Sequence, residues 1–263
     1  MQGVESVSLT FGNDTVLDSA VMDAIRVHEA WHLYCQSIWA GGDLSVFKPV
    51  ADIVKKISLP AEKATKIVGL NCFANLETMS VSGDLAEVDF TRLTKLKSLS
   101  INENSKGGNW HLCEWLNHLM ISVNMPNLKK LKALKYLRSL SSTRALKSFE
   151  GIADLPALRE LRVGGCHLPT VEGLGRLPNL RLLLLNLMPK LESLKGIEGL
   201  PILEELDVTQ CGGLREVSAI STLKKLKKLE LAFCPHIKSL EGIKLPPDCK
   251  VDFVPKGKVG DAF

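Results

Sequence analysis

The feature that most constrains this chain is an internal repeat. Nine segments follow the pattern L-x-x-L-x-[LV] or a close apolar variant of it, at spacings of 20 to 23 residues. Their first apolar residues are Val54, Leu76, Leu96, Leu116, Leu137, Leu158, Leu180, Leu203 and Leu226. The repeat therefore runs from about residue 51 to 245. In the Leu137 unit, Ser142 takes the third apolar position, and a register that starts at Leu134 stays open there.

Each unit is predicted to form a short strand followed by a turn. Alternate side chains of a strand face opposite sides, so the apolar residues at offsets 0, 3 and 5 point into one core. The eighth position carries Asn, Asp or Cys in most units, and such side chains bond the backbone where the chain turns. We call this eighth position of successive units the ladder position. It is occupied, among others, by Asn104, Asn124, Cys166, Cys211 and Cys234. One unit cannot bury its apolar face alone, so its stability must come from stacked neighbours.

Segments such as HIKSLEGIKLP and KLESLKGIEGLPILEELDV resemble those of leucine-rich-repeat proteins of the short 22–23-residue class with an Asn/Cys ladder. The resemblance covers about three-quarters of the chain. It implies an α/β repeat fold, a leucine-rich-repeat solenoid with a curved parallel β-sheet on the concave side. Short helical, 3-10 or irregular segments would form the convex side. It also implies a binding role with an open choice of partner, because proteins of this fold bind unrelated molecules.

The two ends depart from the repeat and are interpreted as caps, since a terminal unit has one face without a neighbour. Val4, Val7 and Leu9 alternate like a strand, and Asp18 can cap a helix from about residue 20 to 39. We expect three parts: an N-terminal strand and capping helix in 1–50, about nine leucine-rich repeats in 51–245, and a capping strand at 250–254 with a loose tail in 246–263.

The sharpest chemical motif is His28-Glu29-Ala30-Trp31-His32, which falls in the expected helix. On a helix, H-E-x-x-H places both imidazoles on one face, where they bind zinc with the glutamate beside them as general base. The metzincin extension is missing after His32, and 50 residues are too few for a two-lobed protease domain. We therefore favour a helix that packs on the first repeat over a zinc hydrolase. We expect no catalytic residue, no metal and no cofactor.

A second potential ligand set, His111, Cys113 and His118, lies within one repeat unit, and the repeat explains it better than a zinc site does. The chain has seven cysteines and no Cys-x-x-Cys pair, which favours free thiols and a reducing compartment. No apolar run approaches the roughly 20 residues of a membrane span, and no secretory signal is visible at the start. We expect an intracellular, cytoplasmic protein that does not bind membranes.

The charge balance argues against nucleic acid as the main partner. Lys and Arg number 33 against 29 Asp and Glu, a net charge of +4. Lysine-rich clusters at 129–138 and 224–228 alternate with leucines and are interpreted as solvated faces. The chain has 8 Phe, 4 Trp and 2 Tyr, which leaves few platforms for stacking bases.

The outward side chains of the strands predict where a partner binds. In the first half they are small hydroxyls such as Ser58, Ser80 and Ser100, whereas the second half combines two leucines with charged groups. Two leucines facing water within a charged rim resemble the apolar centre and polar rim of an interface. The expected partner-binding residues are Glu160, Arg162, Leu182, Leu184, Glu205, Asp207 and Glu230.

The sequence therefore predicts a non-catalytic protein-binding scaffold or adaptor that presents its concave face to a protein partner. One alternative is a structural subunit of a ribonucleoprotein assembly that contacts nucleic acid through the lysine-rich flank. Another is a regulatory subunit of an enzyme such as a phosphatase or a ubiquitin ligase.

Overall fold

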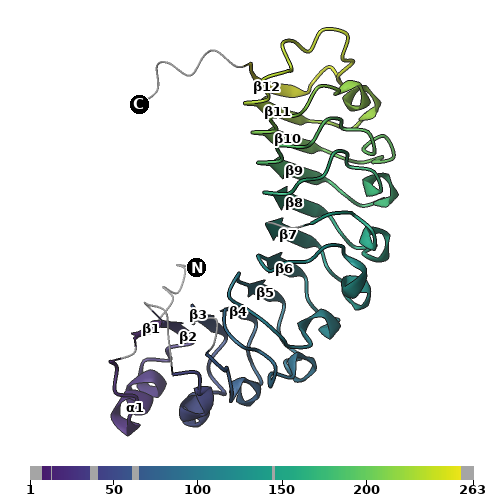
Figure 1. Ribbon diagram of the computed structural model, residues 1–263. Helices are drawn as coiled ribbons and strands as arrows, with labels where there is room; N and C mark the ends of the chain where they lie inside the picture. Colours follow the sequence, from purple (N-terminus) through teal and green to yellow (C-terminus); the bar gives the residue numbers. More distant parts are fainter. Residues whose placement is uncertain (1–7, 13, 36–40, 61–64, 144–145, 256–263) are drawn as a thin grey trace. The chain divides into compact units, whose positions relative to one another are not determined.

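The computed structural model describes residues 8–12, 14–35, 41–60, 65–143 and 146–255. The chain divides into two compact units, residues 1–123 and 124–263. In each unit, parallel strands line one side and the connecting segments with their 3-10 helices line the other (Figure 1). This alternation of strand and turn is the arrangement that the repeat predicts.

The described residues of unit 1 form six parallel strands in chain order, one α-helix and four 3-10 helices. The strands are β1 (Ser8–Phe11), β2 (His32–Cys35), β3 (Lys56–Leu59), β4 (Thr78–Val81), β5 (Ser98–Ile101) and β6 (His118–Ile121). The helices are α1 (Ser19–Val27), η1 (Leu44–Val50), η2 (Leu70–Cys72), η3 (Phe90–Arg92) and η4 (Trp110–Leu112).

Unit 2 has the same plan, and the part of it that the structure describes contains six further parallel strands in chain order. The strands are β7 (Ser139–Thr143), β8 (Glu160–Gly164), β9 (Leu182–Asn186), β10 (Glu205–Thr209), β11 (Lys228–Ala232) and β12 (Lys250–Val254). The 3-10 helices are η5 (Lys129–Ala133), η6 (Ile152–Asp154), η7 (Leu174–Arg176) and η8 (Ser218–Thr222). The C-terminal strand predicted at 250–254 is observed with those bounds.

The core follows the apolar positions of the repeat. In the β9 unit, Leu180, Leu183 and Leu185 are completely buried. Leu183 is the register partner of Leu161 on β8 and Leu206 on β10. Because neighbouring strands lie about 4.8 Å apart, each leucine stacks directly on its equivalents, and the repeats of unit 2 share a continuous apolar core.

The structure settles the register that the sequence left open near residue 137. Leu137 and Leu140 are fully buried, and Leu140 is the register partner of Leu161. Ser142 takes the third core position, where it pairs with Val163 and is itself buried. The unit therefore starts at Leu137.

The cysteines of the ladder are buried where each strand ends, as the repeat predicts. The Cys211 thiol lies 3.5 Å from the Thr209 carbonyl and 3.8 Å from the Leu185 carbonyl of the preceding coil. Cys234 repeats these contacts with Ala232 and Val208, at 3.5 and 3.7 Å. Each thiol thus contacts the carbonyl of the last strand residue in its own coil and one carbonyl of the preceding coil. All seven cysteines are thiols, and none of them forms a disulfide.

The residue before this ladder position has a left-handed backbone in four successive coils of unit 2. Gly165 has φ 65°, and Leu187, Gln210 and Phe233 have φ values of 52°, 56° and 55°. The amide of Gln210 donates to the Ala232 carbonyl at 3.0 Å, which extends the hydrogen-bond ladder by one residue. The ladder therefore holds three non-glycine residues in a conformation that L-residues adopt reluctantly.

The N-terminal helix is shorter than predicted, and the expectation of a helix to residue 39 is wrong. Asp18 caps α1 by accepting a hydrogen bond from the Val21 amide at 3.0 Å, as expected. The helix ends at Val27, because Glu29 takes a left-handed backbone with φ 50°. The Ala30 amide then donates to the Ile25 carbonyl at 2.9 Å, which completes a Schellman cap.

The chain continues from this cap into strand β2, which pairs with β1 and β3. Leu33 and Cys35 are fully buried, whereas His32 and Tyr34 point to the other side of the sheet. The alternation of side chains along a strand buries both Leu33 and Cys35. The prediction that this segment is helical, made from the spacing of its apolar residues, is therefore wrong. Of the residues assigned to these elements, Val4, Val7, Ile38 and Trp39 lie outside the described part of the chain.

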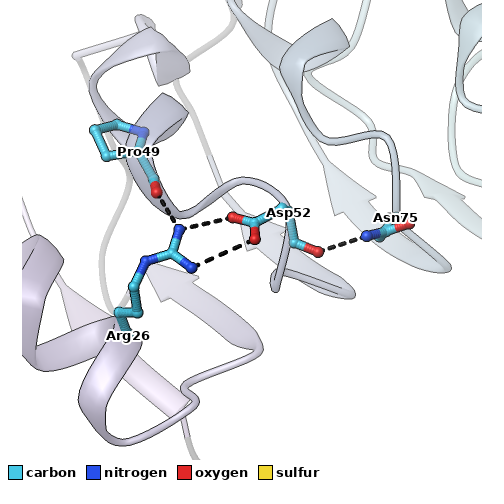
Figure 2. A network of polar contacts seen from close by, with 4 residues as sticks. All are labelled: Arg26, Pro49, Asp52 and Asn75. Carbon is cyan, nitrogen blue, oxygen red and sulfur yellow. Dashed lines mark hydrogen bonds and ion pairs between the residues drawn. The ribbon is translucent and has the colours of Figure 1, made fainter.

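A polar network ties the end of α1 to the next connecting segment (Figure 2). The Arg26 guanidinium binds both carboxylate oxygens of Asp52, at 2.9 and 3.4 Å, and also donates to the Pro49 carbonyl. Asn75 of the following repeat donates its amide to the Asp52 carbonyl. The helix that precedes the regular repeats is thereby bonded to the first of them.

Candidate protein-binding surface

The seven residues predicted to bind a partner lie on four adjacent strands of unit 2, β8 to β11. They alternate with buried core residues, so their side chains share the outward side of the sheet. Register pairing forms two rows across the strands. The first row is Glu160, Leu182, Glu205 and Lys228, and the second is Arg162, Leu184, Asp207 and Glu230. We call these eight residues the β8–β11 face.

Lys228 is the one residue of this face that is not among the seven predicted ones. Its position directly opposite Glu205 follows from the repeat register, so the signal was present in the sequence. Its ammonium group lies 3.4 Å from a Glu230 carboxylate oxygen.

The centre of the face is hollowed. A depression of about 210 Å³ is lined by Arg162, Leu182, Leu184, Glu205, Asp207, Lys228 and Glu230, with buried Leu183 and Leu206 beneath them. Leu182 and Leu184 are partly exposed to it. The hollow thus has an apolar floor and a charged rim.

The rim contains two ion pairs, one at each side. Arg162 Nη1 lies 2.6 Å from Glu160 Oε2, and Ser139 of β7 also donates to this oxygen, at 3.2 Å. Lys228 pairs with Glu230 on β11. Each pair joins two residues of the same strand, β8 or β11. Neither cation therefore forms an ion pair with the carboxylates of β10, Glu205 and Asp207.

Asp207 has a buried oxygen atom in the hollow, Oδ1, that lacks a hydrogen bond among the described residues. Partial burial raises the pKa of the Asp207 carboxyl, and the nearby negative charge of Glu230 raises it further. Lys228 and the Thr209 hydroxyl act in the opposite direction.

The outward side chains of β4 and β5 in unit 1 are small hydroxyls, as predicted, whereas Tyr34 on β2 and Met120 on β6 are large and exposed. Ser80 and Ser100 bond Asn102 at 3.5 and 3.2 Å, so these small polar groups interact with one another. At the start of the unit, the His32 ring bridges Ser8 and Ser58 through its two nitrogens, each at 3.2 Å. These hydroxyls present little apolar area to a partner.

The H-E-x-x-H motif does not lie on one helical face. His28 follows the last residue of α1, Glu29 has the left-handed backbone, and His32 belongs to β2. Burial lowers the pKa of His32, with a further contribution from the charge of Lys56. Within the described ranges, no three His, Cys, Asp or Glu side chains are grouped as metal ligands.

The second potential ligand set, around Cys113, is also part of the core. Cys113 is completely buried, and burial raises the pKa of its thiol to about 12. A thiol with this pKa stays protonated at neutral pH, whereas metal ligation requires the thiolate. Its sulfur lies 3.7 Å from the Phe90 carbonyl of the preceding coil.

The two lysine-rich clusters are partly neutralised by neighbouring carboxylates. Lys129 pairs with Glu150 at 2.7 Å, and Lys227 pairs with Glu204 at 2.8 Å. Glu204 also pairs with Arg181, and these two cations hold the pKa of its carboxyl below the usual value, with Lys227 the larger contributor. The lysines therefore belong to a mixed-charge surface.

The helices of the described residues are all too short or too polar to cross a bilayer. No family profile and no curated protein sequence matches the chain.

Solved structures match it in fold at low sequence identity. The internalin InlF of Listeria monocytogenes has a TM-score of 0.62 at 15% identity, over 86% of this chain and 67% of that one. Mouse RP105 in its complex with MD-1 has a TM-score of 0.58 at 17% identity, over 95% and 52%. TLR13 in complex with ssRNA13 has a TM-score of 0.55 at 15% identity, over 84% and 34%. With its nine sequence repeats and stacked parallel strands, the chain is a leucine-rich-repeat protein in fold.

Proposed function

We propose that this protein is a non-catalytic scaffold or adaptor that binds a protein partner through the β8–β11 face. The observation that carries the proposal is the pair Leu182 and Leu184, partly exposed in a hollow with a charged rim. An apolar centre inside a polar rim is the usual anatomy of a protein interface. Binding energy at interfaces concentrates in a few central, desolvated residues, and Leu182, Leu184 and Arg162 line the centre of this face.

The chemistry of the face supports binding rather than catalysis. It consists of leucines, carboxylates and two cations, without a nucleophile next to a general base. The solved structures of similar fold include RP105 with MD-1 and TLR13 with ssRNA13, so this architecture is compatible with protein and nucleic-acid partners. The mixed charges around the lysine clusters favour a protein partner here.

Affinity capture with a matched pair of variants tests the proposal. Leu184→Asp places a charge at the apolar centre, on an outward side chain, and should abolish capture of the partner without unfolding the protein. Ser80→Asp makes the same kind of change on β4 and should leave capture unchanged. Partners would be identified by mass spectrometry, and circular dichroism would confirm the fold of both variants. Normal capture by Leu184→Asp would refute the assignment of the site.

We also propose an intracellular, cytoplasmic location, supported by seven cysteines that form no disulfide. Fractionation of cells that produce the tagged full chain tests this proposal. Recovery in the extracellular medium with thiols blocked or oxidised would contradict it.

A further inference from the structure

The carboxylates of β10 are left without a cation on an otherwise paired surface. Arg162 is held by Glu160 at 2.6 Å, and Lys228 is held by Glu230 at 3.4 Å. Within the described part of the chain, neither Glu205 nor Asp207 has an ion-pair partner. Three carboxylates and two cations line the hollow, so its net charge is −1 (2 − 3).

The position of Asp207 narrows what can occupy the hollow. Its Oδ1 atom is already buried and without a partner, and Leu184 is its register neighbour on β9. A purely apolar occupant would remove the remaining water from this carboxylate and offer no hydrogen bond in return, which is costly for a charged group. An anionic occupant would add repulsion from Glu205 and Glu230.

A lysine or arginine side chain meets both requirements of the site. Its aliphatic stem is apolar, and such side chains commonly bury the stem while the charged head reaches a polar partner. Leu182 and Leu184 supply the surface for the stem, and the β10 carboxylates supply charged acceptors for the head. Hydrogen bonds between a cation and a carboxylate are stronger than neutral ones.

We infer that the hollow is a subsite for one basic side chain of the protein partner, lysine or arginine, with Leu182 and Leu184 contacting its stem and Asp207 and Glu205 binding its head. The inference deepens the proposed function and rests on it, because it names the chemistry that this face recognises. The partner segment would place one cation over β9 and β10, between the existing ion pairs of β8 and β11.

Small-molecule probes of the two side chains test the inference without a known partner. We would titrate n-butylammonium chloride and n-propylguanidinium chloride at constant ionic strength and follow the Leu182 and Leu184 methyl signals by NMR. We expect saturable shifts in the millimolar range, the order appropriate to ligands this small. n-Butanol keeps the stem without the charge, and butyrate reverses the charge. Both should bind at least tenfold more weakly.

Two asparagine variants identify the carboxylate that binds the head. Asp207→Asn keeps the shape of the side chain and should weaken n-butylammonium binding at least tenfold. Asp252→Asn changes an exposed carboxylate of the same row on β12 and should leave the binding unchanged. The inference is overturned by non-saturable shifts, by equal shifts with n-butanol, or by undiminished binding to Asp207→Asn.

The outcomes separate this inference from the proposed function. If Leu184→Asp abolishes partner capture while the alkyl cations fail to bind, the face is a partner site and the basic subsite is wrong. If the cations bind through Asp207 while Leu184→Asp captures partners normally, the subsite is real and the proposed scaffold surface is wrong.

Discussion

Leu184 on β9 and Asp207 on β10 are register partners, so this carboxylate has an apolar side chain as its neighbour across the strands. On the other side, its register partner is the like-charged Glu230. The pKa of Asp207 is raised, first by burial and then by Glu230, while Lys228 offsets part of the effect. The folded protein therefore holds a proton on Asp207 to a higher pH than the unfolded chain does.

We expect Asp207→Asn to stabilise the protein at neutral pH. A carboxyl with a raised folded pKa lowers the free energy of unfolding as the pH rises from its unfolded pKa through its folded pKa. The amide removes this effect, so the urea midpoint at about pH 7 should increase relative to the natural chain, with little difference at about pH 3. The same measurement on Asp252→Asn is the control. A lower midpoint for Asp207→Asn at neutral pH would contradict the assigned environment.

In the core of the repeat, we expect a substitution to lower the free energy of unfolding. Leu183 is fully buried between Leu161 and Leu206, and Leu183→Ala should cost about 2–5 kcal/mol of unfolding free energy. Because each coil contacts mainly its neighbours, hydrogen exchange should increase most in β8, β9 and β10. Leu184→Ala, on the outward side of the same strand, should cost clearly less. An unchanged urea midpoint for Leu183→Ala would show that the register is wrong.

The left-handed residues at the strand ends give a prediction about backbone strain. Gln210 has φ 56°, a conformation that glycine adopts without steric cost. Gln210→Gly should therefore leave stability unchanged or raise it by up to about 1 kcal/mol, after the entropy of the unfolded chain offsets part of the gain. Glu205→Gly, in the extended part of β10, should instead destabilise the protein by about 0.5–1 kcal/mol. Urea denaturation of both variants measures the difference in sign.

How far the sequence predicts this protein depends on whether a residue belongs to the repeat. Leu161, Leu183 and the ladder cysteines occur at fixed offsets, so their burial and the strand register follow from spacing alone. His32, Leu33 and Cys35 precede the regular repeat, where helical and strand spacing both fit the apolar residues. The segment forms a strand because it pairs with β1 and β3. Local sequence does not reveal such pairing between segments that are distant in the chain.

The candidate site was predictable in its position but not in its electrostatics. The offsets placed the two leucines and the charged residues on one side of the strands. They did not indicate that Arg162 bonds Glu160 on its own strand, or that Asp207 Oδ1 has no partner. These properties depend on side-chain rotamers within the hollow, which the repeat pattern does not constrain.

The geometry of the H-E-x-x-H segment predicts a protein without zinc. His28 and His32 belong to different elements, and the His32 ring is already bonded to Ser8 and Ser58 at 3.2 Å. We expect protein purified without a His tag to contain no stoichiometric zinc by inductively coupled plasma mass spectrometry. One zinc per chain that is lost in His32→Ala would revive the hydrolase alternative.

The last prediction separates a protein partner from a nucleic-acid partner by the response to salt. A protein that neutralises 6–10 phosphates loses about 10³–10⁵-fold in affinity between 50 and 200 mM salt. Binding centred on Leu182 and Leu184, with one basic side chain in the hollow, should weaken by less than about tenfold over this range, because few counterions are released. The measurement is the dissociation constant of the captured partner at both salt concentrations.

A charge-neutralising variant completes this test. Lys129 and Lys227 already pair with Glu150 and Glu204, so their removal takes little free positive charge from the surface. Lys129→Gln combined with Lys227→Gln should therefore leave the affinity for the captured partner and its salt dependence unchanged. A loss of affinity together with a shallower salt slope would assign these lysines to phosphate contacts. Such a result would favour the ribonucleoprotein alternative. A lysine that contacts phosphate contributes both to the affinity and to its salt dependence, so its removal lowers both.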